Sequence, residues 1–390
     1  MKKRVTAVIL LSIIGVISIC ACSQKTEESN VIDIGNAYDN RKPVMASDYF
    51  SSIEYIPLET SKESLIDDVS KVIAVVADDR IIVRSYGTSR INAFDYSGRI
   101  LEFNAKEGRA KDEFHGVLDI LAYKDELYVV QQNKILIYDK NGNHRETIDT
   151  GTCDFFFNTP FIIEERLFGI LGDDIAQKQL CIDRIDGTGK RIYGDPVVSY
   201  TGEGSKQRYI NRNGMNLPLP RRMPGFICNE NEEVFLIIGE SIYTISKETF
   251  QKSGEYHIDY GKYVDELARK RVLFLLETPK FLMTTILFSK QRFDSPAGYI
   301  MPPFVYDYAT GKTRILPYNE EFKRNGFVND VNDDELIFLP KMCRGNKMYE
   351  LIDAINFIDM AEKSKSGKIK EVASKLTEES NPVLVVGTLK

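Results

Sequence analysis

Short runs of apolar residues recur along the chain from residue 50 to its end. Most runs alternate apolar and polar positions or are briefly all-apolar, as at 81–83 (IIV) and 127–130 (LYVV). Runs of this kind, bounded by Asp, Asn and Gly, predict β-strands joined by tight turns. No helix-period segment separates the early runs, which excludes a parallel βαβ arrangement. The pattern therefore predicts antiparallel hairpins.

One unit recurs along these runs: a strand, a short turn, a second strand ending in Asp, and a turn that contains Gly. The turn glycines of the first three copies, Gly98, Gly142 and Gly187, are 44 and 45 residues apart. Weaker copies follow at 233–248, 304–311 and 335–339. Four short antiparallel strands in each unit of roughly 40 to 50 residues are typical of a β-propeller blade. The predicted fold is all-β, a six-bladed β-propeller with small helical insertions; seven blades are the alternative.

Each end of the predicted propeller, residues 50–390, carries a candidate strand, at 53–58 and at 382–386. An open series of blades would leave two sheet edges unpaired. We therefore expect the two terminal strands to share one sheet.

Three stretches interrupt the period and are expected to be insertions: 201–223, 262–280 and 343–380. Apolar residues at helical spacing predict a helix at 263–274 and another at 349–361. Their apolar faces are expected to pack on the propeller, and a groove for a partner is the alternative.

The beginning of the chain has the composition of an export leader. A basic start is followed by an apolar run, 8–19, that is too short to span a bilayer comfortably. Residues 19–22 (ICAC) resemble the bacterial lipoprotein box, which implies cleavage before Cys22 and lipidation of its sulfur. An ordinary signal peptide followed by a chance cysteine is the alternative.

The leader prediction divides the N-terminal region in two. Residues 1–21 are expected to be a signal peptide, and residues 22–49 a lipid-anchored tether and N-terminal arm. Acyl chains each add about 0.8 kcal/mol of membrane affinity per buried methylene. The expected location is the outer membrane, at its periplasmic face or at the cell surface.

The net charge of the chain excludes one class of function. The leader contains Lys2, Lys3 and Arg4 and no acid, so its removal changes the formal net charge from −6 to −9. An acidic surface repels phosphate, which excludes a protein that coats nucleic acid. The composition, 43% hydrophobic and 28% charged, is that of an ordinary globular protein.

The insertion at 201–223 departs from this acidic background. It holds five Lys and Arg residues against one acid, Glu203, a local charge of +4. Arginine pairs suit carboxylates and anionic glycans, and a tyrosine ring offers a stacking face. The candidate ligand-binding residues here are Arg208, Tyr209, Arg212, Arg221 and Arg222. A solvated basic loop without a ligand is the alternative.

Three segments carry a family resemblance: 51–60 (SSIEYIPLET), 94–99 (FDYSGR) and 381–386 (NPVLVV). Through them the chain resembles the six-bladed β-propeller lipoproteins of gut-type Gram-negative bacteria, which are distantly similar to NHL-repeat propellers. Members commonly carry a Gly-x-Gly-Pro-Gly-Glu-Tyr/Phe run between the first two blades. Residues 108–114 (GRAKDEF) keep its first Gly, its Glu and its aromatic residue but not the central Gly-Pro-Gly. The resemblance implies a fold and a location, and no particular reaction.

Catalytic and metal-binding motifs are not found in the sequence. The three histidines, His115, His144 and His257, have no His or Cys at metal-ligand spacing, so neither a metal nor a cofactor is expected. The acidic pairs, such as Asp78-Asp79, are interpreted as turns rather than calcium loops. His115 and Glu113 are further candidate ligand-binding residues, because the second blade starts there, at the expected mouth of the channel.

Four cysteines follow Cys22: Cys153, Cys181, Cys228 and Cys343. They lack the dense spacing of a disulfide scaffold, so most are expected to be small buried hydrophobes. A bridge between Cys153 and Cys181 is the alternative.

Taken together, these patterns favour a monomeric, non-enzymatic binding or scaffold module. The expected partners are a glycan, a carboxylate ligand or a protein, outside the cytoplasm. The alternative is a propeller enzyme, a lyase or hydrolase that uses acids and histidines at the channel mouth.

Overall fold

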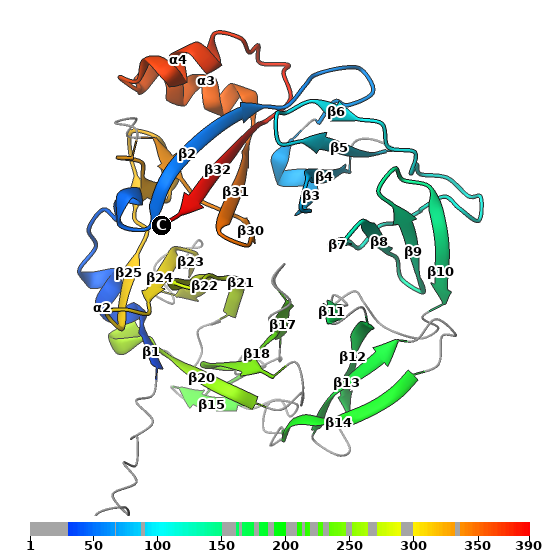
Figure 1. Cartoon of the computed structure of the whole chain (residues 1–390). Helices are drawn as coiled ribbons and strands as arrows, with labels where there is room; N and C mark the ends of the chain where they lie inside the picture. The colour runs from blue at the N-terminus through cyan, green and yellow to red at the C-terminus, as the bar shows by residue number, and fades with distance from the viewer. Residues whose placement is uncertain are drawn as a thin grey trace, which may run out of the picture. The chain divides into compact units, whose positions relative to one another are not determined.

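Six antiparallel sheets of four or five strands contain most strands in the described part of the chain (Figure 1). This computed structural model describes residues 30–66, 68–86, 90–149, 161–163, 166–174, 179–185, 191–199, 209–212, 215–218, 225–228, 234–246, 252–263, 271–289, 299–331 and 336–390. Residues 31–390 form one compact unit. Four of the six sheets are built from strands close together in sequence, and each of the other two also includes a strand from the N-terminal end of the unit.

The first three sheets are simple meanders. Sheet 1 consists of β3 (Val72–Val76), β4 (Arg80–Ser85), β5 (Ile91–Asp95) and β6 (Ile100–Leu101). Sheet 2 consists of β7 (Asp119–Tyr123), β8 (Glu126–Val130), β9 (Lys134–Asp139) and β10 (His144–Asp149). Sheet 3 consists of β11 (Phe161–Ile163), β12 (Arg166–Asp174), β13 (Gln179–Ile185) and β14 (Arg191–Ser199).

The other three sheets are less regular. Sheet 4 consists of β17 (Gly225–Cys228), β18 (Val234–Ile238), β19 (Ser241–Ile245) and β20 (Lys252–Asp259), and β1 (Asn30–Asp33) pairs with β20. Sheet 5 consists of β21 (Arg271–Glu277), β22 (Phe281–Ser289), β24 (Pro303–Asp307) and β25 (Lys312–Ile315), with β23 (Tyr299–Ile300) beside β22. Sheet 6 consists of β30 (Met342–Arg344), β31 (Lys347–Ile352), β32 (Val383–Leu389) and β2 (Phe50–Pro57).

Short hairpins and helices complete the described elements. The hairpins are β15 (Tyr209–Arg212) with β16 (Met215–Pro218), β26 (Tyr318–Asn319) with β27 (Arg324–Asn325), and β28 (Phe327–Val328) with β29 (Ile337–Phe338). The helices are α2 (Ile34–Asp39), α3 (Ala354–Lys363) and α4 (Gly367–Ala373), with 3-10 turns η1 (Ala46–Asp48), η2 (Val69–Lys71) and η3 (Gly261–Tyr263). None of the described helices is long and apolar enough to cross a membrane.

Neighbouring residues in one strand pack against different sheets. Ile81 joins the hydrophobic cluster shared with sheet 6, whereas Ile82 joins the cluster shared with sheet 2. Leu282 and Met283 divide in the same way between sheets 4 and 6. Because successive side chains of a strand point to opposite faces, a strand buried on both faces is apolar throughout. This double burial explains the all-apolar runs.

The predicted pairing of the terminal strands is confirmed. β2 and β32 are antiparallel neighbours in sheet 6, with Tyr55 opposite Val385 and Pro57 opposite Val383. The N–H of Leu58 also donates to the carbonyl of Pro382 at 3.1 Å. Sheet 6 therefore takes one strand from the start of the unit and three from its end (Figure 1).

Pairing of β2 with β32 also explains one incorrect expectation. The run 335–339 was expected to begin the sixth repeat, but its strand β29 pairs only with β28. Sheet 6 already has four strands because the N-terminal strand supplies one of them. The run at 335–339 therefore lies outside that sheet.

The predicted helices are partly wrong. Residues 271–274 belong to strand β21, which pairs with β22, and 264–270 lie outside the described residues. Residues 349–352 belong to β31, so the helix starts at Ala354 and not at 349. Helix α3 does pack on the sheets as expected, through buried Phe357, Met360 and Ala361, while Ile355 is exposed.

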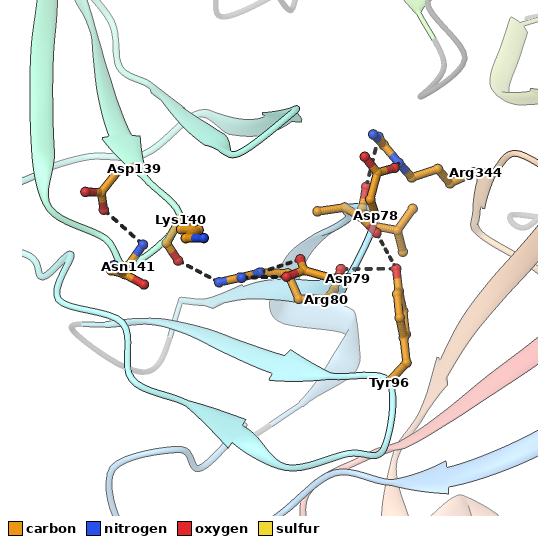
Figure 2. A network of polar contacts seen from close by, with 10 residues as sticks. Asp78, Asp79, Arg80, Tyr96, Asp139, Lys140, Asn141 and Arg344 are labelled. Atoms are coloured by element: carbon orange, nitrogen blue, oxygen red, sulfur yellow. Dashed lines mark hydrogen bonds and ion pairs between the residues drawn. The ribbon is translucent and has the colours of Figure 1, made fainter.

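A polar network between sheets gives the pair Asp78-Asp79 a structural role (Figure 2). Both residues lie in the turn between β3 and β4. Arg344 of sheet 6 binds Asp78 with 2.7 Å between Nε and Oδ1. Arg80 binds Asp79 and also donates through Nη1 to the carbonyl of Lys140 in sheet 2, at 2.6 Å. The interpretation of this pair as a turn is thus confirmed, and the turn connects three sheets.

Candidate functional site

A large cavity lies where edge strands of several sheets meet. Its volume is about 1060 Å³. Every residue of β3 and β7 lines it, together with Ile162 of β11, Phe274 of β21 and Met342 of β30. Each of these strands is an edge strand of its own sheet. Five sheets therefore each contribute an edge strand to the wall of one cavity.

The cavity has one mainly apolar region and one charged region. The side chains from β3 are half-buried Val, Ile and Ala, and Leu121 and Phe274 extend this apolar wall. Helix α3 and the β26–β27 hairpin line another part of the cavity. Most of the charged side chains of the lining lie in this part, on the hairpin, on or just before α3, in β31 and at the residue before β30. They are Lys323, Arg324, Lys341, Glu350, Asp353, Asp359 and Lys363.

Three of these charged residues form a cluster, which we call the cavity triad: Arg324, Lys341 and Glu350. Glu350 is only 3% exposed. Its Oε1 binds Nη2 of Arg324, and its Oε2 accepts the N–H of Leu339 at 2.8 Å. Lys341 reaches the cavity from the residue before β30, with Nζ 5.3 Å from the ring centre of Phe274.

Burial shifts the titration of two triad members. Desolvation raises the pKa of Glu350, and the positive charge of Arg324 opposes that shift. Desolvation also lowers the pKa of Lys341, an effect that Arg324 reinforces and Glu350 opposes.

The residues predicted in the basic insertion are mostly beyond what the structure describes. Arg208, Arg221 and Arg222 lie outside the described residues. The backbone of Tyr209 and Arg212 belongs to β15, where they stand opposite Pro218 and Met215. Ligand binding by this insertion stays a prediction.

Glu113 supports the loop that precedes β7. Its Oε2 accepts the N–H of Ala110 at 3.0 Å, and its Oε1 lies 3.3 Å from Nζ of Lys106. These two contacts lower the pKa of Glu113, the hydrogen bond from Ala110 most strongly. A Cβ on Gly108 would stand 1.8 Å from the carboxylate, so a larger residue at that position would displace the Glu113 side chain from these contacts. The residues kept from the family motif thus have a structural role in this loop.

His115 is exposed, with 73% of its side chain accessible and Nδ1 3.9 Å from Oε1 of Glu107. Neither His115 nor Glu113 is among the described residues that line the cavity. The two stay predictions as ligand-binding residues.

Sequence reasoning missed the cavity triad. Its members come from three separate elements, and no motif joins them. Glu350 alone left a signal, because it is a charged residue within the strand 347–352 (KMYELI), between apolar neighbours. Of the four cysteines after Cys22, Cys343 has a described side chain, and that side chain is buried as expected.

Comparisons with known structures identify the fold. BF0058, described as an exported protein of Bacteroides fragilis, has a TM-score of 0.57 at 13% identity, covering 92% of this chain and 99% of that one. The β-propeller domain of Cps50 from Myceliophthora thermophila matches at a TM-score of 0.36 and 9% identity, over 71% of this chain and 92% of that one. The extracellular domain of a hybrid two-component system from B. thetaiotaomicron matches at 0.37 and 11% identity, over 77% and 31%.

The fold is all-β, built from four- and five-stranded antiparallel sheets of the kind that form propeller blades, and it is similar to that of BF0058. No match to the chain was found among curated proteins. One family model, described as a domain of unknown function (DUF4934), matches residues 29–388. The match covers nearly all of the 390 residues, and the chain therefore belongs to the DUF4934 family.

Proposed function

We propose that this chain is an exported, monomeric, six-bladed β-propeller, lipid-anchored at Cys22 to the outer membrane, that binds a small ligand in its central cavity. The observation that carries the proposal is the convergence of edge strands from five sheets on one cavity of about 1060 Å³. That volume is at the upper end of the range of roughly 300 to 1,000 Å³ in which proteins bind small molecules.

Six blades are supported by how the sheets pack. Hydrophobic clusters join sheet 6 to sheet 1, sheet 1 to sheet 2, and sheet 2 to sheet 3. Further clusters join sheet 4 to sheet 5 and sheet 5 to sheet 6. Such a sequential order of sheets is what a propeller with one blade per sheet requires.

Export is supported by the leader and by two of the similar proteins. BF0058 is described as exported, and the matched part of the two-component system is described as extracellular. The lipoprotein box at 19–22 supports the anchor at Cys22.

Binding has more support than catalysis. The cavity wall is apolar with a few convergent polar groups, which is the usual make-up of a small-molecule site. The enzyme alternative relies on acids and histidines at the channel mouth, but Glu113 is held within its own loop and His115 points to solvent. A glycan or a protein bound at the basic insertion is a second mode of binding that the same anchored propeller would allow.

A neutral apolar probe tests the cavity directly. N-phenylnaphthylamine fluoresces in apolar sites, and we expect saturable binding with one site per chain. Ala122→Trp places a large ring in the wall of β7 and should abolish that signal, whereas Ala309→Trp in the exposed turn after β24 should not. Absence of saturable binding, or equal binding by both variants, would refute the proposal.

A further inference from the structure

We infer, on the basis of the proposed function, that the ligand of this cavity is an amphipathic carboxylate, whose anionic group binds Arg324 and Lys341 while its apolar body lies against β3 and β7.

Arg324 has donors beyond those that Glu350 uses. Its Nη2 binds Glu350, and its Nη1 lies 3.8 Å from the sulfur of Met360, a weak acceptor. Its Nε is buried and has no hydrogen-bond partner among the described residues. A buried donor left unpaired costs about 1–3 kcal/mol, so an acceptor that reaches this side of the guanidinium gains affinity.

Lys341 adds a second cation at the same cavity. No described residue forms a hydrogen bond or an ion pair with its Nζ. Both oxygens of Glu350, the acid of the triad, already have partners in Arg324 and the N–H of Leu339. The two cations and one carboxylate give the triad a formal charge of +1.

The cavity lining as a whole has a formal charge of zero, four basic against four acidic side chains, so the surplus of +1 belongs to the triad alone. Asp353 is engaged at the start of α3, where its Oδ1 accepts the N–H of Val69 at 3.0 Å. Lys363 donates to the carbonyl of Glu321 at 2.8 Å. A monoanionic carboxylate balances a charge of +1, whereas a phosphate monoester carries about −1.5 to −2 and would leave an excess of negative charge.

The apolar wall defines the rest of the ligand. β3 is only half-buried from Val72 to Val75, although its side chains are aliphatic. At roughly 25 cal/mol per Å², covering such a surface favours an alkyl or alicyclic body over a sugar. Charge at one part of the cavity and aliphatic wall at another together specify an amphipathic acid.

The test uses four probes with the same ten-carbon chain: decanoate, decanol, decylamine and decyl phosphate. In isothermal titration calorimetry we expect decanoate to bind at least tenfold more tightly than each of the other three. Lys341→Met should weaken decanoate about tenfold and leave decanol unchanged. The matched control, Lys347→Met, removes an exposed lysine outside the cavity lining and should change neither.

Arg324 is tested together with its partner, because removing it alone would leave Glu350 buried and unpaired. Arg324→Met combined with Glu350→Gln removes both charges and should also abolish the preference for decanoate, with near-UV circular dichroism confirming the fold. If decanol and decanoate bind equally, the cavity binds ligands but the inference is wrong. Stronger binding of decyl phosphate or decylamine also overturns it. If none of the four binds and phenylnaphthylamine does not bind either, the proposed function fails as well.

Discussion

The carboxylate of Asp95 organises the turn between β5 and β6. Its Oδ1 accepts hydrogen bonds from Oγ of Ser97 at 2.6 Å, from the N–H of Ser97 at 2.8 Å and from the N–H of Arg99 at 3.0 Å. Gly98 follows with a φ of +86°, and a Cβ there would stand 2.1 Å from the carbonyl oxygen of Pro57. Asp139 and Gly142 repeat the arrangement in sheet 2. Aspartate and glycine are thus each required by the geometry of the turn.

Asp95→Asn should destabilise the protein in a pH-dependent way. The hydroxyl of Ser97 is the main cause that lowers the pKa of Asp95 to about 2. In the unfolded chain the value is about 3.9, so the charged form stabilises the fold fully above that pH and loses its effect as pH falls toward 2. We expect a loss of about 1 kcal/mol at pH 7 that shrinks at pH 3, measured by urea unfolding.

The control for this prediction is Asp112→Asn, which changes an exposed aspartate in the loop before β7. Its urea midpoint should match that of the wild type at both pH values. An equal loss at pH 7 and pH 3 in Asp95→Asn would contradict the role given to the charge of Asp95.

Residue-scale prediction from the sequence succeeded where the chemistry is local. The turns after β5 and β9 could be predicted because aspartate, glycine and the strand end lie within four residues of each other. The cavity triad could not, since Arg324, Lys341 and Glu350 are brought together only by the packing of three elements. The spacing of these three residues along the chain does not indicate that they lie close together in the fold.

At the scale of elements, the β2–β32 pairing offers a direct test. Ser52 and Thr388 are opposite each other in the ladder, and both are half-buried. Ser52→Cys with Thr388→Cys should form a disulfide and stabilise the protein by about 2–4 kcal/mol, because the bond closes a very long loop. The measurement is the difference in melting temperature between oxidised and reduced protein.

A register control accompanies this pair. Glu54 stands opposite Val386, two positions from Thr388 in the ladder. Diagonal positions of this kind are about 7 to 8 Å apart, too far for an unstrained disulfide. Glu54→Cys with Thr388→Cys should therefore stay reduced, and a bridge in this pair but not in the first would show a different register.

Element boundaries were predicted less well than elements. Apolar residues of β21 alternate between two clusters, with Leu275 facing sheet 4 and Leu276 facing sheet 6. A run buried on both faces has apolar residues at positions that also match a helix. The ladder with β22 decides in favour of the strand, and this pairing partner is not visible in the local pattern.

At the scale of the whole molecule, the repeat predicted the kind of fold correctly. Its period is visible because each unit has the same order of strands and turns, and the propeller fold follows from that order. The contribution of the N-terminal segment to sheet 4 was not foreseen. Residues 30–33 were expected to belong to the arm, yet they pair with β20, and Ile32 and Ile34 are fully buried.

The proposed anchor has a simple test in the whole chain. Expressed with its leader in a Gram-negative host, the wild type should fractionate with membranes. Cys22→Ser removes the only sulfur that the lipoprotein box would acylate, and we expect it to move to the soluble fraction. Cys20→Ser, two residues earlier and before the expected cleavage, is the matched control and should stay with membranes. Membrane retention of Cys22→Ser would contradict lipidation at that residue.

The pairing of β1 with β20 has a mechanical consequence. A pulling force applied at the N-terminal end of the chain reaches β1 before it reaches β2, because β1 comes first in sequence. The hydrogen bonds between β1 and β20, with the burial of Ile32 and Ile34, must yield before any load arrives at the β2–β32 ladder. The strand pairing that joins the two ends of the unit is therefore protected from tension by a separate attachment in sheet 4.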